Sequence, residues 1–110
     1  MSLNWDAVVA IAAALPGTEI TTYYGDPAVK ANGRPIVTPG REPGSFALHI
    51  DLDTKAMLIE TDPATFWETP HYHGWPSVLV RYATDDPERV AALIARSHAW
   101  ALARKPPRKR

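Results

Sequence analysis

Apolar side chains recur at helical spacing at both ends of the chain. The first stripe follows Asn4, a residue type that caps helices, and consists of Trp5, Val8, Ile11, Ala12 and Leu15. Pro16-Gly17 ends this helix, because proline cannot continue it and glycine accepts a left-handed exit. The second stripe follows the helix-start signal 84–88 and consists of Val90, Leu93, Ile94, Ser97, Trp100 and Ala101. The pattern therefore predicts one amphipathic helix at each end.

Between these helices the pattern changes to the shorter period of strands. Residues 19–24 are β-branched and aromatic, and residues 45–51 alternate, with Phe46, Leu48 and Ile50 inward and His49 on the other face. The segments 28–31 and 34–38 flank Asn32-Gly33, a strong signal for a two-residue hairpin turn. Because Pro35 cannot donate a ladder hydrogen bond, we expect its strand at an edge or bonded on one side only. Residues 78–82 predict a further strand.

A broken helix is predicted between residues 53 and 67. Asp53 is expected to cap a short first piece that carries Ala56, Met57 and Ile59. Asp62-Pro63 repeats the start signal, with a capping aspartate and proline at the first helical position, and predicts a second piece that carries Phe66 and Trp67. Residues 71–76, punctuated by glycine and proline, are irregular.

The order of these elements defines the fold class. It reads helix, antiparallel β-meander, broken helix, strand and C-terminal helix, which predicts an α+β fold with the helices packed on one face of the sheet. We expect residues 1–103 to form one domain, followed by a basic, disordered tail over residues 104–110.

Composition narrows the class of protein further. The 110 residues include no cysteine, which excludes a disulfide scaffold and a thiolate metal site. No apolar run approaches the roughly 20 residues of a membrane helix and residues 1–6 carry no secretion signal, so we expect a cytoplasmic protein without membrane contact. Five of the 12 basic residues lie in the last seven positions; the remainder of the chain then has seven basic and 12 acidic residues, a net charge of −5.

Two longer motifs resemble a known family. Residues 15–19 (LPGTE) with 24–30 (YGDPAVK), and residues 69–81 (TPHYHGWPSVLVR), are similar to the two signatures of the MmcQ/YjbR-like family. The resemblance covers roughly residues 4–103. It implies a compact α+β fold likened to that of CyaY and described as a double wing, from which DNA binding is commonly inferred for the family. The family has no agreed catalytic residues.

Basic residues near the predicted hairpin and at the C-terminus are the candidates for contact with DNA. They are Lys30, Arg34, Arg41, Arg104, Lys105 and Arg108. Lysine and arginine hold phosphates as a point charge and as a planar fork. A solvated hairpin tip and a solubilising tail explain the same residues without a ligand. The resemblance and the tail together lead us to expect weak, salt-dependent, nonspecific DNA binding, by a chain for which a monomer is favoured over an oligomer.

The second motif offers a different site. His71, Tyr72, Trp75 and Arg81 gather aromatic and cationic groups that could hold a flat ligand in a groove, or close the core. A small-molecule or protein-interaction module is therefore the alternative function. His71 and His73 could share a metal, but no third ligand follows from the spacing, so we predict no metal and no cofactor. None of the common nucleophile, phosphate-loop or dinucleotide motifs is present, and we expect no catalysis.

Overall fold

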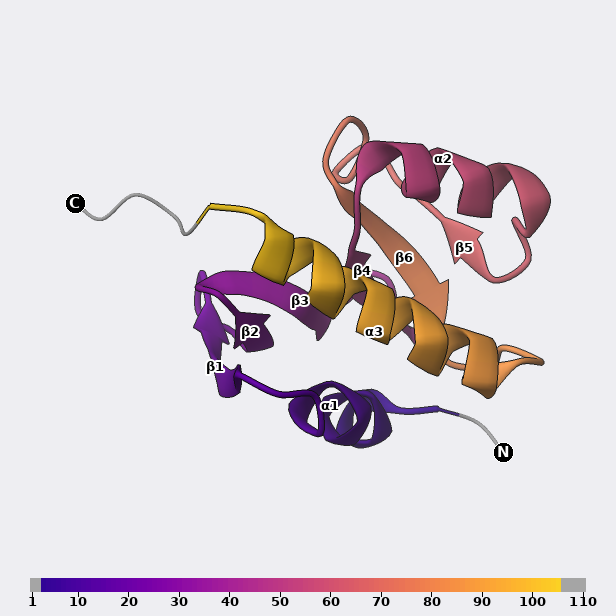
Figure 1. Cartoon of the computed structure of the whole chain (residues 1–110). Helices are drawn as coiled ribbons and strands as arrows, with labels where there is room; N and C mark the ends of the chain where they lie inside the picture. The colour runs from indigo at the N-terminus through magenta and orange to yellow at the C-terminus, as the bar shows by residue number, and fades with distance from the viewer. Residues whose placement is uncertain (1–2, 106–110) are drawn as a thin grey trace.

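The protein, seen in a computed structural model that describes residues 3–105, is built on a six-stranded antiparallel sheet (Figure 1). The strands lie in the order β1-β2-β3-β4-β6-β5. The elements along the chain are α1 (Trp5–Ala13), β1 (Thr18–Tyr23), β2 (Asp26–Ala31), β3 (Arg34–Pro39), β4 (Ser45–His49), α2 (Leu52–Thr61), β5 (Phe66–Trp67), β6 (Ser77–Arg81) and α3 (Pro87–Ala103). The predicted α+β class is confirmed.

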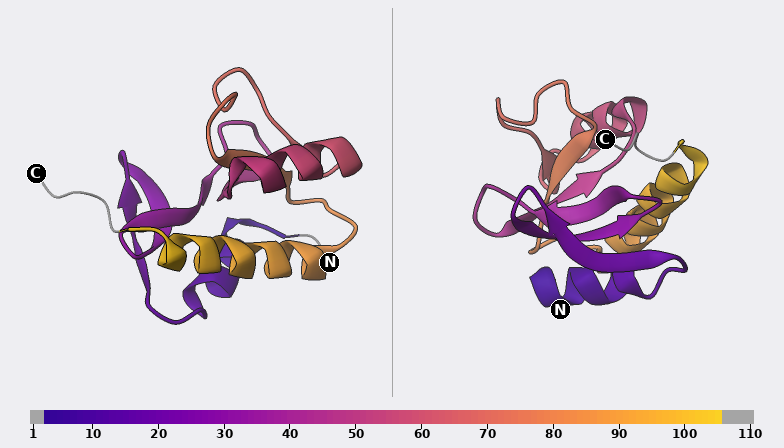
Figure 2. Two further views of the ribbon diagram at one scale, coloured as in Figure 1. Left: turned by 45° about the horizontal axis from the view of Figure 1, so that its top comes forward. Right: turned by 90° about the vertical axis from the view of Figure 1, so that its left-hand side faces the viewer.

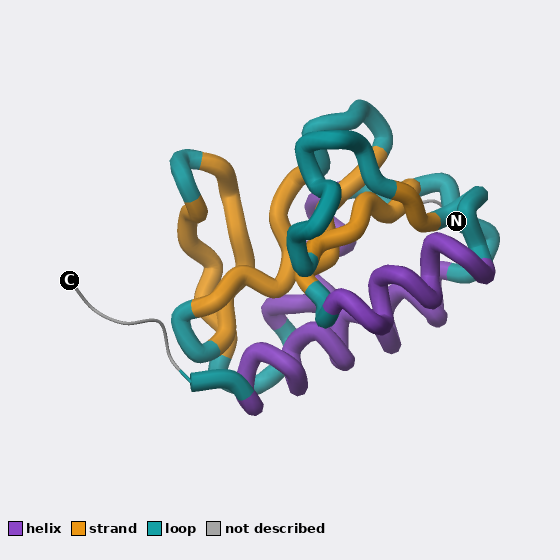
Figure 3. The backbone as a smooth tube through the Cα atoms, turned by 90° about the horizontal axis from the view of Figure 1, so that it is seen from above, coloured by secondary structure: helices purple, strands orange, loops and turns teal. Residues whose placement is uncertain are grey.

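The helices cover one face of the sheet. Val8 of α1, Leu58 of α2 and Ile94 of α3 belong to the same buried cluster as Phe46 and Leu48 of β4. Seen from above, α2 and α3 run along one side of the strands, whereas loops rise on the other side (Figure 3). The loop between β5 and β6, orange in the left view of Figure 2, stands away from α3. One face of the sheet is thus used for the core, and the other carries loops.

The predicted helix starts are confirmed at both ends of the chain and wrong in the middle. Asn4 Oδ1 accepts a hydrogen bond from Ala7 N at 2.8 Å, and Asp86 Oδ1 accepts one from Arg89 N at 3.0 Å. In α2 the cap is Asp51, whose carboxylate accepts from Thr54 N at 3.0 Å, and Asp53 lies in the first turn. The shift of two residues follows from β4, which ends at His49 and leaves Asp51 with the extended backbone that a cap requires.

The face that α2 buries also differs from the prediction. Thr54, Lys55 and Leu58 are buried, whereas Ala56 is exposed and Met57 is 41% exposed. The helix therefore turns inward a set of positions that includes a lysine, a residue type that sequence patterns assign to solvent.

The second helical piece is absent, because Phe66 and Trp67 form strand β5 on β6. Phe66 pairs with Val80 and Trp67 with Leu79. Phe66 enters the main core, and Trp67 packs with a smaller cluster on the other face, as neighbouring residues of a strand do. The Asp62-Pro63 start signal is local, and pairing with the edge of the sheet overrides it.

The hairpin between β2 and β3 forms as predicted. Asn32 and Gly33 have φ of 55° and 73°, the left-handed backbone that this type of turn requires. Pro35 lies opposite Lys30 of β2, and the pairing of β3 with β4 begins only at Val37. The expectation that the strand of Pro35 lies at an edge or is bonded on one side only is wrong, because β3 lies between β2 and β4. The strand tolerates the proline because Pro35 precedes the first residue that pairs with β4.

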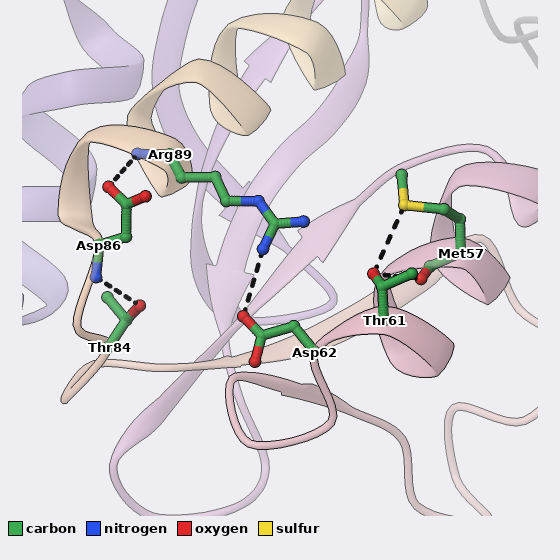
Figure 4. Close-up of polar contacts among 6 residues, drawn as sticks. All are labelled: Met57, Thr61, Asp62, Thr84, Asp86 and Arg89. Atoms are coloured by element: carbon green, nitrogen blue, oxygen red, sulfur yellow. Dashed lines mark hydrogen bonds and ion pairs between the residues drawn. The ribbon is translucent and has the colours of Figure 1, made fainter.

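A polar contact joins the start of α3 to the residue that follows α2. Arg89 Nη1 lies 3.2 Å from Asp62 Oδ2, and the backbone N of Asp86 donates to Thr84 Oγ1 (Figure 4). The same guanidinium lies 5.3 Å from the ring centroid of Phe66. Arg89 thereby links α3 to the β5 end of the sheet. Within residues 3–105, no helix has the length and apolar character needed to cross a membrane.

Candidate functional site

A pocket of about 440 Å³ opens on the face of the sheet that the helices leave free. Its first wall comes from the β1–β2 turn, β3, β4 and the loop after β3, and comprises Tyr23, Tyr24, Asp26, Thr38, Pro39, Arg41 and His49. Its second wall comes from the loop between β5 and β6 and the start of β6, and comprises His71, Tyr72, Trp75, Pro76 and Ser77. We call this site the aromatic pocket.

Aromatic rings in edge-to-face contact form part of the first wall. The rings of Tyr23 and Tyr24 meet edge to face with centroids 4.6 Å apart, and Tyr23 meets the imidazole of His49 at 6.1 Å. Tyr24 is 89% exposed and has a φ of 51°, a left-handed backbone that is unfavourable for a bulky residue. The turn thus holds an exposed aromatic ring at the edge of the pocket in a strained conformation.

Two polar side chains of the first wall, Thr38 and His49, are called the pocket floor below. Thr38 Oγ1 lies 3.0 Å from His49 Nε2. Burial lowers the pKa of His49 from 6.5 to about 4, since the charged imidazolium would lose its water. The backbone beneath is held by Ser97 of α3, whose hydroxyl donates to the carbonyl oxygen of His49. The floor is therefore a neutral imidazole paired with a hydroxyl.

The second wall is anchored by Tyr72. This side chain is 7% exposed, packs on Ala47 and Leu79, and accepts a hydrogen bond at its hydroxyl from Arg41 N at 3.1 Å. His71 meets the ring of Tyr72 edge to face at 4.9 Å. Trp75 is 65% exposed. The loop therefore buries one aromatic residue as a support and leaves the next one available.

A buried lysine holds this loop in place. Lys55 of α2 is 4% exposed, and its Nζ donates to Tyr72 O at 2.7 Å and Trp75 O at 2.8 Å and lies 2.7 Å from Glu68 Oε1. Glu68 Oε2 lies 2.8 Å from His73 Nδ1. The hydrogen bonds from Lys55 and His73 lower the pKa of Glu68. Lys55 was not predicted to be buried; the signal in the sequence was its spacing of three from Leu58, which places both residues on one helix face.

Three of the four predicted groove residues line the aromatic pocket, and Arg81 does not. The guanidinium of Arg81 lies 4.1 Å from the ring centroid of Trp67, and its Nε donates to Ala64 O at 2.8 Å. The strand register explains this, because Arg81 lies at the far end of β6 from Ser77, which does line the pocket. The pocket also includes residues that sequence reasoning missed, chiefly Tyr23, Thr38 and His49.

The residues predicted to contact DNA do not form one strip. Arg41 lines the aromatic pocket, and Lys30 lies with its Nζ 5.5 Å from the ring centroid of Tyr23. Arg34 Nε and Nη2 instead donate to Lys105 O, at 3.1 and 2.8 Å, at the end of α3. We call Arg34, Arg104 and Lys105 the basic tip.

The basic tip is packed on the domain. Arg104 lies 4.3 Å from the ring centroid of Trp100, and its pKa is lowered by burial and by the charge of Arg34. Asn32 Nδ2 donates to Ala101 O at 3.0 Å and Arg104 O at 2.7 Å. Arg104 and Lys105, predicted to begin a disordered tail, thus contact the hairpin tip. The rest of that predicted tail, including Arg108, lies outside the described residues.

The two histidines of the second motif, His71 and His73, have different neighbours. His73 pairs with Glu68, whereas His71 lines the aromatic pocket. In the described part of the chain, no three side chains of the metal-binding types gather in one place.

The fold and site define a small α+β domain with helices on one sheet face and an aromatic pocket on the other. The chain belongs to the YjbR family, whose sequence model matches residues 13–100. The uncharacterized protein Rv2570 of Mycobacterium tuberculosis and the uncharacterized protein Mb2600 of Mycobacterium bovis are each 28% identical to it over 115 residues, covering 90% of this chain and 87% of theirs. No solved structure matches the chain. The resemblance seen in the two sequence motifs is confirmed.

Proposed function

We propose that the chain is a non-catalytic binding module for a small planar aromatic molecule, held in the aromatic pocket. The volume of about 440 Å³ falls within the range of about 300–1,000 Å³ typical of small-molecule sites. Its lining includes six aromatic side chains, with imidazoles counted, from the two walls. The function expected first from the sequence, DNA binding, becomes the second candidate because its residues are dispersed.

The main support for this proposal is the exposure of the Tyr24 and Trp75 side chains. Among the described residues, the large apolar side chains left exposed include two aromatic ones, and both line this pocket. An exposed ring offers a face on which a flat molecule can stack, which contributes about 1–3 kcal/mol for a nucleic-acid base. Exposure of both rings at one pocket therefore favours a stacked ligand.

The pKa values of His49 and Tyr23 favour binding without catalysis. A histidine whose pKa is about 4 is unprotonated at neutral pH and only a weak general base. Burial and the neighbouring Tyr24 raise the pKa of Tyr23, which keeps its phenol protonated. The floor of the pocket can therefore donate and accept hydrogen bonds, but it is poorly suited to moving protons at neutral pH.

Titration with four planar probes tests the proposal. The probes are indole-3-acetate, indole-3-acetamide, adenosine monophosphate and adenosine. Calorimetry measures the affinity of the protein for each of them. We expect at least one to bind with a Kd below roughly 1 mM, and Trp75→Ala to raise that Kd about tenfold. Trp100→Ala, which removes a tryptophan outside the pocket, serves as the control and should leave the Kd unchanged. Binding by none of the four probes, or equal effects of both variants, would reject the pocket.

A second candidate, weak nonspecific DNA binding, is favoured by the basic tip. Arg34 and Arg104 lie close enough for one charge to lower the other's pKa, and Lys105 adjoins them. A phosphate would relieve this repulsion. The net charge of −5 on residues 1–103 opposes it.

The salt dependence of binding to duplex DNA separates this candidate from the first. If the basic tip binds phosphate, affinity falls steeply between about 50 and 200 mM salt. Arg34→Gln should then weaken binding and lower the salt slope by about one, whereas Arg81→Gln, the same change on the sheet face, should not. If the protein does not bind duplex DNA at about 50 mM salt, or if its affinity for DNA does not change with salt, DNA binding is rejected as a function.

A further inference from the structure

Arg41 is held rigidly at the edge of the aromatic pocket. Its backbone N donates to the hydroxyl of buried Tyr72, which ties the loop after β3 to the second wall. The loop is closed by a hydrogen bond from Gly40 N to Ser45 O at 3.2 Å and by one from Ser45 Oγ to Glu42 O at 2.6 Å. A Cβ on Gly40 would clash with Ser45 Oγ and lie 3.1 Å from the backbone C of Ser45, so the loop is packed too closely to accept one. The base of the Arg41 side chain therefore has a fixed position.

The guanidinium of Arg41 differs from those of the other arginines with described contacts. Arg89 pairs with Asp62, Arg81 lies on Trp67, and Arg104 lies on Trp100. Within residues 3–105, no carboxylate oxygen lies within 4.0 Å of Arg41. A cation that lines a pocket without a carboxylate partner is free to hold an anionic group of a ligand.

The other charged side chain of the pocket lies on a different segment. Asp26 belongs to the start of β2, next to the β1–β2 turn, whereas Arg41 belongs to the loop after β3. No ion pair joins the two among the described residues. An anionic group of a ligand in this pocket is attracted by Arg41 and repelled by Asp26.

We infer that the ligand of the aromatic pocket is a planar aromatic acid, whose carboxylate or phosphate group binds the guanidinium of Arg41. This inference rests on the proposed function and adds the charge of the ligand to it. The guanidinium presents a planar fork of N–H donors that matches the two oxygens of either anion. The ring of the ligand stacks on the exposed rings of Tyr24 and Trp75, and its polar edge faces Thr38 and His49.

Matched pairs of probes test the charge independently of the ring. Indole-3-acetate and indole-3-acetamide differ in one carboxylate, and adenosine monophosphate and adenosine differ in one phosphate. We expect the acid of at least one pair to bind at least tenfold more tightly than its neutral partner, and the pair that shows the larger ratio identifies carboxylate or phosphate as the preferred anion. Arg41→Gln should weaken binding of that acid about tenfold.

Two further variants separate an effect of the charges in the pocket from an effect of the overall charge of the protein. Asp26→Asn removes the repelling charge and should tighten binding of the acid, whereas Arg81→Gln removes a cation outside the pocket and should leave it unchanged. Equal binding of acid and neutral probe, with Trp75→Ala still weakening both, would overturn this inference alone. Binding by no probe overturns the proposed function together with it. An equal loss in Arg41→Gln and Arg81→Gln would show that only the overall charge matters.

Discussion

Replacing Lys55 by alanine is expected to lower the free energy of unfolding by about 3 kcal/mol and to release the loop that forms the second wall of the pocket. The change leaves the carbonyl oxygens of Tyr72 and Trp75 without their donor and the carboxylate of Glu68 without its cation. The side chain of Glu68 is 27% exposed and can regain water, which keeps the loss at the lower end for a buried pair.

Urea unfolding measures the loss in stability, and probe titration measures the loss of the pocket. Lys30→Ala is the matched control, because this lysine lies over the ring of Tyr23 and makes no ion pair with a described residue. It should cost less than about 1 kcal/mol. If the Lys55 variant unfolds at the same urea concentration as the parent protein, Lys55 does not hold the loop.

Lowering the pH from 6.5 to 4 is expected to reduce the free energy of unfolding by at most about 3 kcal/mol through His49 alone. Burial lowers the pKa of this imidazole from 6.5 to about 4 in the folded chain. The unfolded chain therefore binds a proton at His49 first as the pH falls. This contribution is complete above pH 6.5 and disappears as the pH falls toward about 4. Each pKa unit of difference corresponds to about 1.4 kcal/mol, and residual contact of His49 with water at the pocket reduces the sum.

The variant His49→Gln isolates this effect, since glutamine keeps a polar group and does not titrate. Its stability should vary less with pH than that of the parent protein, and the difference between the two free energies of unfolding should change by at most about 3 kcal/mol between pH 6.5 and 4. His71→Gln removes an exposed histidine of the same pocket and is the control. Glu68 and Asp51 have lowered pKa values, so their contributions begin to be lost as the pH falls through the ordinary values of 4.5 and 3.8, in the parent protein and the His49 variant alike. Parallel curves for the His49 variant and the parent protein would contradict the burial of a neutral imidazole.

Local signals in the sequence predicted those parts of the fold that local interactions decide. The caps Asn4 and Asp86 and the Asn32-Gly33 turn each depend on residues within a few positions, and each is found. Strand β5 was missed, because Phe66 and Trp67 gain their partners from β6, more than ten residues further along the chain. An equally local signal at Asp62-Pro63 predicted a helix instead.

The candidate site likewise has one part that local sequence patterns predict and another that depends on strand pairing. The second wall lies within one sequence motif, so His71, Tyr72 and Trp75 could be assigned to a groove before the fold was known. Tyr23 and His49 reach the pocket through strand pairing across β1 to β4, which no local pattern reveals. Burial of Lys55 depends on two carbonyl groups that appear only once the loop has closed over α2.

The most direct test of the aromatic pocket is a map of amide chemical shifts during titration with whichever probe binds most tightly. We expect the largest changes at residues from both walls, namely Tyr24, Thr38, Tyr72 and Trp75. Arg34 and Arg104, at the basic tip, should show little change. The opposite distribution, with the largest changes at Arg34 and Arg104 and none at Tyr24 or Trp75, would contradict it.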